Sequence, residues 1–166
     1  LTLIRGYLEE ALGARVQLVQ RRTYQEITAM LLAGQIDAAW ICGYPYVRHR
    51  DDFALLAVPI WRGQPLYQSY LIGRPTGDEG SLADLRDEIH AFSDPDSNSG
   101  YLVTTAALAA IGTSPEAFFA RSFFTYGHRN VVRAVASGLA QSGSVDGYVW
   151  EALTVAEPAL PTATRV

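Results

Sequence analysis

Apolar residues recur at helical spacing at the start of the chain, which predicts a helix over residues 3–12 that ends at Gly13. A second helix is predicted behind Thr23, because Thr23 and Glu26 form the pattern of a capping box. Short apolar runs at 16–19 and 36–41 alternate with these helices and predict buried strands. Helices that alternate with strands favour an α/β fold with a parallel sheet.

The second half of the chain repeats this alternation. Two β-like runs, 53–61 and 66–73, come first, and the polar stretch 74–80 behind them is the best candidate for a boundary between two lobes. The pattern then predicts helices at 81–86, 99–111 and 128–138 and strands at 89–92, 122–126 and 145–149. The proline-containing segment 157–161 predicts no regular element.

An internal similarity indicates two lobes of related build. The segments LLAGQIDAAW (31–40) and VASGLAQSGSVDGYVW (135–150) both close a helix at a glycine and open a strand with an apolar residue followed by Asp. Chance similarity of common helix-to-strand turns is the alternative. We expect a first lobe with the crossing strands at 1–73, a second lobe at 74–155 and a return segment towards the first lobe at 156–166.

Composition narrows the class of protein. The chain has 166 residues, of which 49% are hydrophobic and 18% charged, as is typical of a folded globular protein. A net charge of −4 argues against a general nucleic-acid surface. The single cysteine, Cys42, allows no internal disulfide and no zinc site based on cysteine pairs, and its apolar neighbours predict that it is simply buried.

The loop SDPDSNSGY (93–101) is the strongest candidate for a binding site. Ser97, Asn98 and Ser99 lie between a predicted strand and a predicted helix, where unpaired main-chain N–H groups and the helix dipole favour an anion. The alternative is that one of these residues only caps the helix. The loop matches neither the phosphate-binding GxxxxGK[ST] pattern nor the GxSxG pattern of a nucleophilic serine.

Further side chains converge on the same place. His128 follows a predicted strand and opens a helix, so it repeats the geometry of the serine loop one unit later, whereas His90 lies within a short apolar strand and is expected to be structural. Tyr24 and Tyr67 lie where phenolic hydroxyls can donate to an anion, although each is also acceptable as a half-buried core tyrosine. A Ser-His-Asp arrangement can be drawn from these residues, but no spacing selects it, and we therefore expect no enzymatic activity.

Two motifs resemble those of the PhnD-like substrate-binding proteins of ABC importers, which are type II periplasmic binding proteins for phosphonate, phosphite and related oxyanions. DPDSNSGYLV (94–103) is similar to the family pattern D-P-x-S-T-S-G-[YF]-L-V, and GHRNVVRAV (127–135) is similar to its G-H-x-x-x-x-x-A-V helix start. The resemblance extends over about 3–150. It implies a two-lobed fold whose first lobe is incomplete at both ends of this chain.

The resemblance also implies which residues bind the ligand. Ser97 and Ser99 match the family serines, Asn98 stands where threonine is usual, and His128 matches the ligand-facing histidine. Tyr24 and Tyr67 match tyrosines that close on the ligand. Asp146 matches an aspartate that we interpret as structural.

For the whole protein, the resemblance implies a transport role. The expected partners are a small oxyanion ligand and an ABC permease, with no nucleic acid, no metal and no cofactor. We also expect a monomeric state and a periplasmic or extracellular location, with or without a lipid anchor. The alternative is that the same fold serves as the ligand-sensing domain of a signalling or transcription-regulatory protein.

Overall fold

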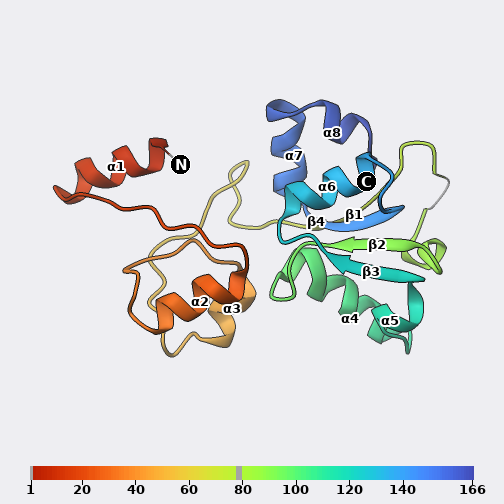
Figure 1. Ribbon diagram of the computed structural model, residues 1–166, viewed down its shortest axis with the longest axis horizontal. Coiled ribbons are helices and arrows are strands. Elements are labelled where there is room, and N and C mark those ends of the chain that lie inside the picture. Colours follow the sequence, from red (N-terminus) through yellow and green to blue (C-terminus); the bar gives the residue numbers. More distant parts are fainter. Residues whose placement is uncertain (1, 78–79) are drawn as a thin grey trace.

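The computed structural model describes residues 2–77 and 80–166 and divides them into two unequal parts. Figure 1 shows helices α2 (Tyr24–Leu32) and α3 (Gly43–Arg48) in the first part, with α1 (Thr2–Leu12) at the far left of the view. The second part holds a four-stranded sheet between two layers of helices. The predicted helix at 3–12 and the capping box of Thr23 and Glu26 are therefore confirmed.

The sheet of the second part has the strand order β1-β4-β2-β3. Its strands are β1 (Ser69–Gly73), β2 (Ile89–Phe92), β3 (Arg121–Phe124) and β4 (Ser142–Asp146). β2 runs parallel to both β3 and β4, and β1 lies antiparallel to β4. The mixed α/β architecture with a parallel core agrees with the expected fold class.

Helices cover both faces of this sheet (Figure 1). α4 (Val103–Ala110) and α5 (Pro115–Phe118) lie on one side, and α6 (His128–Ala136), α7 (Gly147–Ala156) and α8 (Ala159–Thr162) lie on the other. Each face has its own apolar core. The first contains Leu85, Phe92, Leu108, Phe118 and Phe119; the second contains Ile72, Ala91, Val131, Val132, Ala134, Val135, Ala140, Val145 and Leu153.

The strands predicted in the first part of the chain are not formed. Segments 16–19 and 36–41 contain no regular strand, and run 53–61 contributes only an isolated bridge between Trp61 and Gln64. Isolated strands are not stable without a neighbour to pair with, and among the described residues no strand lies beside these segments. Between residues 3 and 67 only Thr28 and Pro45 are buried, so this part has little core of its own.

Four predictions in the second part need correction. β4 ends at Asp146 rather than continuing to 149, because the Asp146 carboxylate accepts the Tyr148 N–H at 3.1 Å and caps α7. The helix predicted at 99–111 is divided into a π-helical turn, Asn98–Leu102, and α4, and the one predicted at 81–86 is a 3₁₀ helix, Leu82–Leu85. The segment predicted to be irregular at the end of the chain contains α8.

The crossing strand and the end of the chain both lie against the second part. β1 pairs with β4 along its length, and Arg165 forms a bridge with Gly73. α8 packs against α6 and α7. The division of the protein at 1–73, 74–155 and 156–166 stays a prediction, and residues 78 and 79 of the predicted boundary lie outside the described residues.

His90 lies at the centre of the sheet and is completely buried. Its Nδ1 is 2.9 Å from the Ser142 hydroxyl and its Nε2 is 2.8 Å from the Ser144 hydroxyl, while its ring stacks on Phe119. Burial lowers the pKa of His90 from 6.5 to about 3. The expectation that His90 is structural agrees with these contacts.

This histidine predicts a specific pH dependence of stability. The native pKa lies below the unfolded one, so its contribution is fully present above about pH 6.5 and is lost as the pH falls below that value. Urea unfolding should lose about 1.4 kcal/mol per pH unit from this group between about pH 6 and about pH 4. His90→Gln, which keeps hydrogen-bonding groups but does not titrate, should show a slope shallower by that amount. Equal slopes for both proteins would contradict the prediction.

Candidate functional site

The loop between β2 and the π-helical turn is anchored by a buried carboxylate. Asp94 is completely buried, and its Oδ1 accepts the Asp96 N–H at 2.9 Å. Its Oδ2 accepts the main-chain N–H of Tyr24 at 3.1 Å, which ties the start of α2 to this loop. Asp94 of the second part thus holds the start of α2, which belongs to the first part.

The three polar residues of the loop have different partners. The Ser97 hydroxyl accepts the Gly100 N–H at 3.0 Å, so Ser97 caps the π-helical turn, which was the simpler alternative for this loop. Asn98 points across to the first lobe, because its Nδ2 donates to the Tyr67 hydroxyl at 3.4 Å. The Ser99 hydroxyl donates to Asp146 Oδ2 at 3.1 Å. The three lie on one turn, but their side chains point in separate directions.

His128 is the first residue of α6 and meets the first lobe directly. The Asp146 main-chain N–H donates to His128 Nδ1 at 3.1 Å, so Nδ1 is the unprotonated nitrogen and the ring proton of the neutral form is on Nε2. Nε2 lies 3.3 Å from the Tyr24 hydroxyl, to which it donates. Burial lowers the pKa of His128 to about 4. His128 is therefore an uncharged hydrogen-bond donor at neutral pH.

Three tyrosines surround these groups. Burial, with Cys42 and Asp94 acting in the same direction, raises the pKa of Tyr24 well above its usual value. Burial also raises the pKa of Tyr67 to about 12 and raises the pKa of Tyr148, where Asp146 and Cys42 add to the effect. All three phenols keep their protons and can donate. Tyr148 was not predicted; its only signal in the sequence is its place just after the strand that ends at Asp146.

Cys42 and Asp146 also belong to the site, although the sequence favoured purely structural roles for both. Cys42 Sγ accepts the Asn98 N–H at 3.4 Å and lies 3.9 Å from the Tyr67 hydroxyl. Asp146 contacts Ser99 with its side chain and His128 with its main chain. Burial raises the pKa of Asp146 to about 6, so the carboxylate is ionised above neutral pH.

These contacts do not form a catalytic triad. A triad histidine receives a carboxylate on Nδ1 and offers Nε2 to the nucleophile. Here Nδ1 receives a main-chain N–H and Nε2 meets the Tyr24 hydroxyl. Ser99 donates to the carboxylate itself. The arrangement brings neutral hydrogen-bonding groups from the two parts of the chain into direct contact, which suits binding rather than nucleophilic chemistry.

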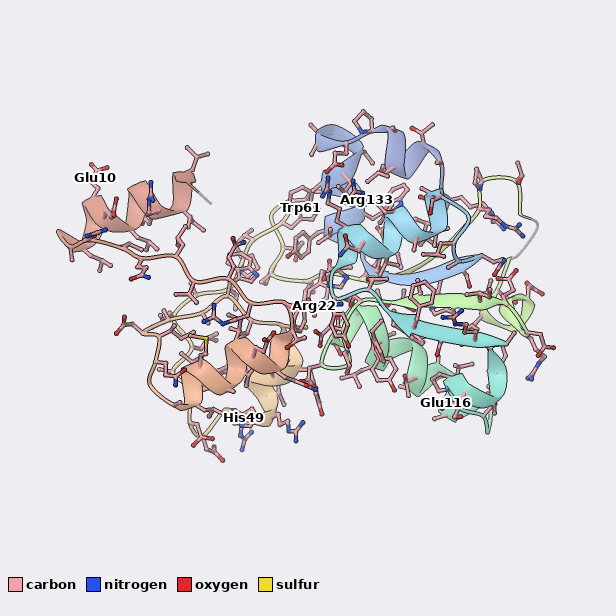
Figure 2. All side chains as sticks on the ribbon, viewed as in Figure 1. Glu10, Arg22, His49, Trp61, Glu116 and Arg133 are labelled. Carbon is pink, nitrogen blue, oxygen red and sulfur yellow. The ribbon has the colours of Figure 1, made fainter. Side chains whose placement is uncertain are left out.

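A second group of contacts joins the lobes beside this site. Glu151 accepts hydrogen bonds from the Trp61 indole and the Tyr70 hydroxyl, each at 2.8 Å, and pairs with Arg62 at 3.1 Å. Figure 2 labels Trp61 at this junction, together with Arg22, whose guanidinium lies 4.9 Å from the centre of the Tyr126 ring.

Comparison with known proteins assigns the chain to a family. Residues 3–166 match the model of the periplasmic substrate-binding proteins of phosphonate ABC transporters. The chain belongs to this family. The phosphate-import protein PhnD of Mycolicibacterium smegmatis is 30% identical over an alignment that covers 82% of this chain and 46% of that protein. This member of the phosphonate-binding family thus spans about half the length of the curated relative.

Solved structures agree on the fold. A binding protein of a phosphonate ABC transporter from Pseudomonas aeruginosa superposes with a TM-score of 0.87 at 22% identity, covering 98% of this chain and 56% of its own. PhnD1 from Prochlorococcus marinus, solved with methylphosphonate, gives a TM-score of 0.81 at 17% identity and covers 99% and 63%. The fold is therefore that of the type II periplasmic binding proteins, of which this chain forms a part.

The close packing around Gly100 predicts that a side chain added at this position destabilises the loop. A Cβ at this position would lie 1.8 Å from Ser93 Oγ and 3.0 Å from His128 Cε1. Gly100→Ala should therefore destabilise the protein by about 1–3 kcal/mol, measured as a lower thermal midpoint. Gly6→Ala is the matched control, because a Cβ there meets no atom within 4 Å and should be neutral or slightly stabilising. Equal thermal midpoints for the two variants would contradict this close packing of the loop.

Proposed function

We propose that this chain forms the binding site for a small phosphorus oxyanion, such as a phosphonate, phosphite or phosphate ester, between the two lobes of an importer's substrate-binding protein. The observation that carries the proposal is the contact between Tyr24 of the first lobe and His128 of the second, 3.3 Å apart. It brings a phenol and a neutral imidazole donor together beside the Asn98 loop. The ligand-binding residues would be Ser97, Asn98, Ser99, His128, Tyr24 and Tyr67.

The chemistry of the donors supports an anion with several acceptor oxygens. The site offers phenolic O–H groups, an imidazole N–H and the Asn98 amide, which together can contact oxygens from opposite sides. None of these donors carries a charge at neutral pH. Hydrogen bonds from neutral donors in a buried site can balance an anion without an ion pair.

The family supports transport over sensing as the role of this site. The family model and the relative from M. smegmatis both describe import components. We infer an ABC permease as the partner of the whole protein and a location outside the cytoplasmic membrane. A monomeric state and a lipid anchor are expectations of the same kind. In 2–77 and 80–166, no helix has the length and apolarity of a membrane span.

Calorimetric titration tests the proposal. The full-chain protein should bind at least one of phosphite, methylphosphonate and phosphate more tightly than about 100 μM, because useful capture needs more than the ~5.5 kcal/mol that this affinity represents. Tyr24→Phe should weaken that binding by about ten- to one-hundred-fold through the loss of a hydrogen bond to a charged group.

Tyr7→Phe provides the matched control. It makes the same chemical change on α1, where Tyr7 is 70% exposed, and it should leave the affinity unchanged. Absence of binding for all three ligands would refute the proposed function. Equal affinities for the Tyr24→Phe variant and the unmodified protein would show that the Tyr24 hydroxyl does not bind the ligand.

A further inference from the structure

Asp146 controls the direction of the hydrogen bonds on both sides of the site. Its carboxylate accepts a hydrogen bond from the Ser99 hydroxyl, with the two oxygens 3.1 Å apart, while its main-chain N–H donates to His128 Nδ1 at 3.1 Å. We propose that Asp146, acting through Ser99, is the positioning residue that makes the site select an oxyanion that still bears an acidic proton over an anion of the same shape without one. This inference rests on the proposed function and names the feature of the ligand that the site would recognise.

The hydrogen bond from Ser99 to Asp146 decides whether the serine hydroxyl can donate to a ligand or only accept from it. A serine hydroxyl has one proton and two lone pairs. Because Ser99 gives its proton to Asp146, it can present only lone pairs to a ligand. A ligand P–OH can donate to this oxygen, whereas a bare ligand oxygen would meet a lone pair with a carboxylate behind it. The remaining groups of the site, His128 Nε2–H and the Asn98 amide among them, are donors to the other oxygens.

Burial holds Ser99 in this orientation. Ser99 is 1% exposed and Asp146 is 5% exposed, so water does not readily replace either partner. Asp146 Oδ1 already accepts the Tyr148 N–H, and Ser99 is the side-chain donor to Oδ2. Turning the serine proton towards a ligand would leave a buried carboxylate oxygen without that donor, which is costly.

Among the side chains that surround Asp146, Asp146 itself is the charged one. They are His128 from α6, Tyr67 from the segment before β1 and Tyr148 from α7. Burial keeps His128 neutral and the two phenols protonated at neutral pH. Asp146 has a pKa of about 6 and is therefore already ionised above about pH 7. In that range, a ligand with a second ionisation is the group whose charge changes.

A pair of ligands of equal shape tests the selection. Methylphosphonate and methanesulfonate both carry a methyl group on a three-oxygen centre, but only methylphosphonate has an acidic proton left in its monoanion. Calorimetry on the full-chain protein at about pH 7 should show methylphosphonate bound at least about tenfold more tightly. The preference should decline towards about pH 9 as methylphosphonate loses that proton, with methanesulfonate binding unchanged.

Asp146→Asn identifies the residue responsible. The main-chain bond to His128 is retained, whereas the new amide can donate to Ser99 and so release the serine proton towards the ligand. The variant should bind methanesulfonate about as well as methylphosphonate and lose the pH slope. Asp96→Asn removes a carboxylate from the same loop without changing the Ser99 contact, and it should keep the preference.

Ser99→Ala gives a second test if Asp146→Asn fails to fold. It removes the acceptor and should also abolish the preference. The two proposals fail in different ways. If none of phosphite, methylphosphonate and phosphate binds, the proposed function is refuted and this inference with it. If both ligands bind equally, or Asp146→Asn keeps the original preference, the site binds oxyanions but Asp146 does not select the protonated form.

Discussion

The hydrogen bond from the Asp146 main chain to His128 Nδ1 determines how the rest of the site is arranged. A main-chain N–H can only donate, so it excludes a proton from Nδ1 and leaves the neutral ring with its proton on Nε2. Burial acts in the same direction by lowering the pKa of the imidazole to about 4. The donor that faces Tyr24 is therefore specified by the backbone of β4 and does not depend on solution conditions near neutral pH.

This bond is possible because the sheet brings the ends of its strands together. β2 and β4 are parallel neighbours, so the serine loop after β2 and Asp146 at the end of β4 meet at one edge. The loop can approach this closely because Gly100 has no Cβ to displace Ser93 and His128. Ligands commonly bind at this edge of open α/β sheets for the same reason. The position of the site is thus a consequence of strand direction and of one glycine.

The second lobe was more predictable from sequence than the first. Residues 89–92 were predicted with the observed bounds, since a buried run bounded by polar turns gives a clear signal. The end of β4 was misplaced, because Asp146 is also the cap of α7 and no periodicity marks that change. Segments 16–19 and 36–41 have the composition of strands, but pairing partners decide whether a strand forms, and local sequence does not contain them.

The same distinction applies to the site. Asn98 and His128 could be proposed because each follows a predicted strand, and Tyr24 because it opens a predicted helix. Cys42 could not, since its contact with Asn98 joins residues 56 positions apart and leaves no trace in either local pattern. Asp146 was interpreted as structural because it matches a family aspartate at the start of a strand; its contacts to Ser99 and His128 depend on the sheet. Contacts made by the tertiary fold are what sequence patterns omit.

The two halves of the site differ in what holds them in place. His128 and Asp146 are fixed by a sheet with apolar cores on both faces, whereas Tyr24, Cys42 and Tyr67 come from a part of the chain with little buried surface. Their position depends on contacts to the second lobe, namely the Asp94 bond to the Tyr24 N–H and the Asn98 bond to Tyr67. The candidate site is therefore complete only when these contacts between the two parts of the chain are formed. A ligand that binds both halves would stabilise the conformation in which they are in contact, by the difference between its affinities for that conformation and for one without these contacts.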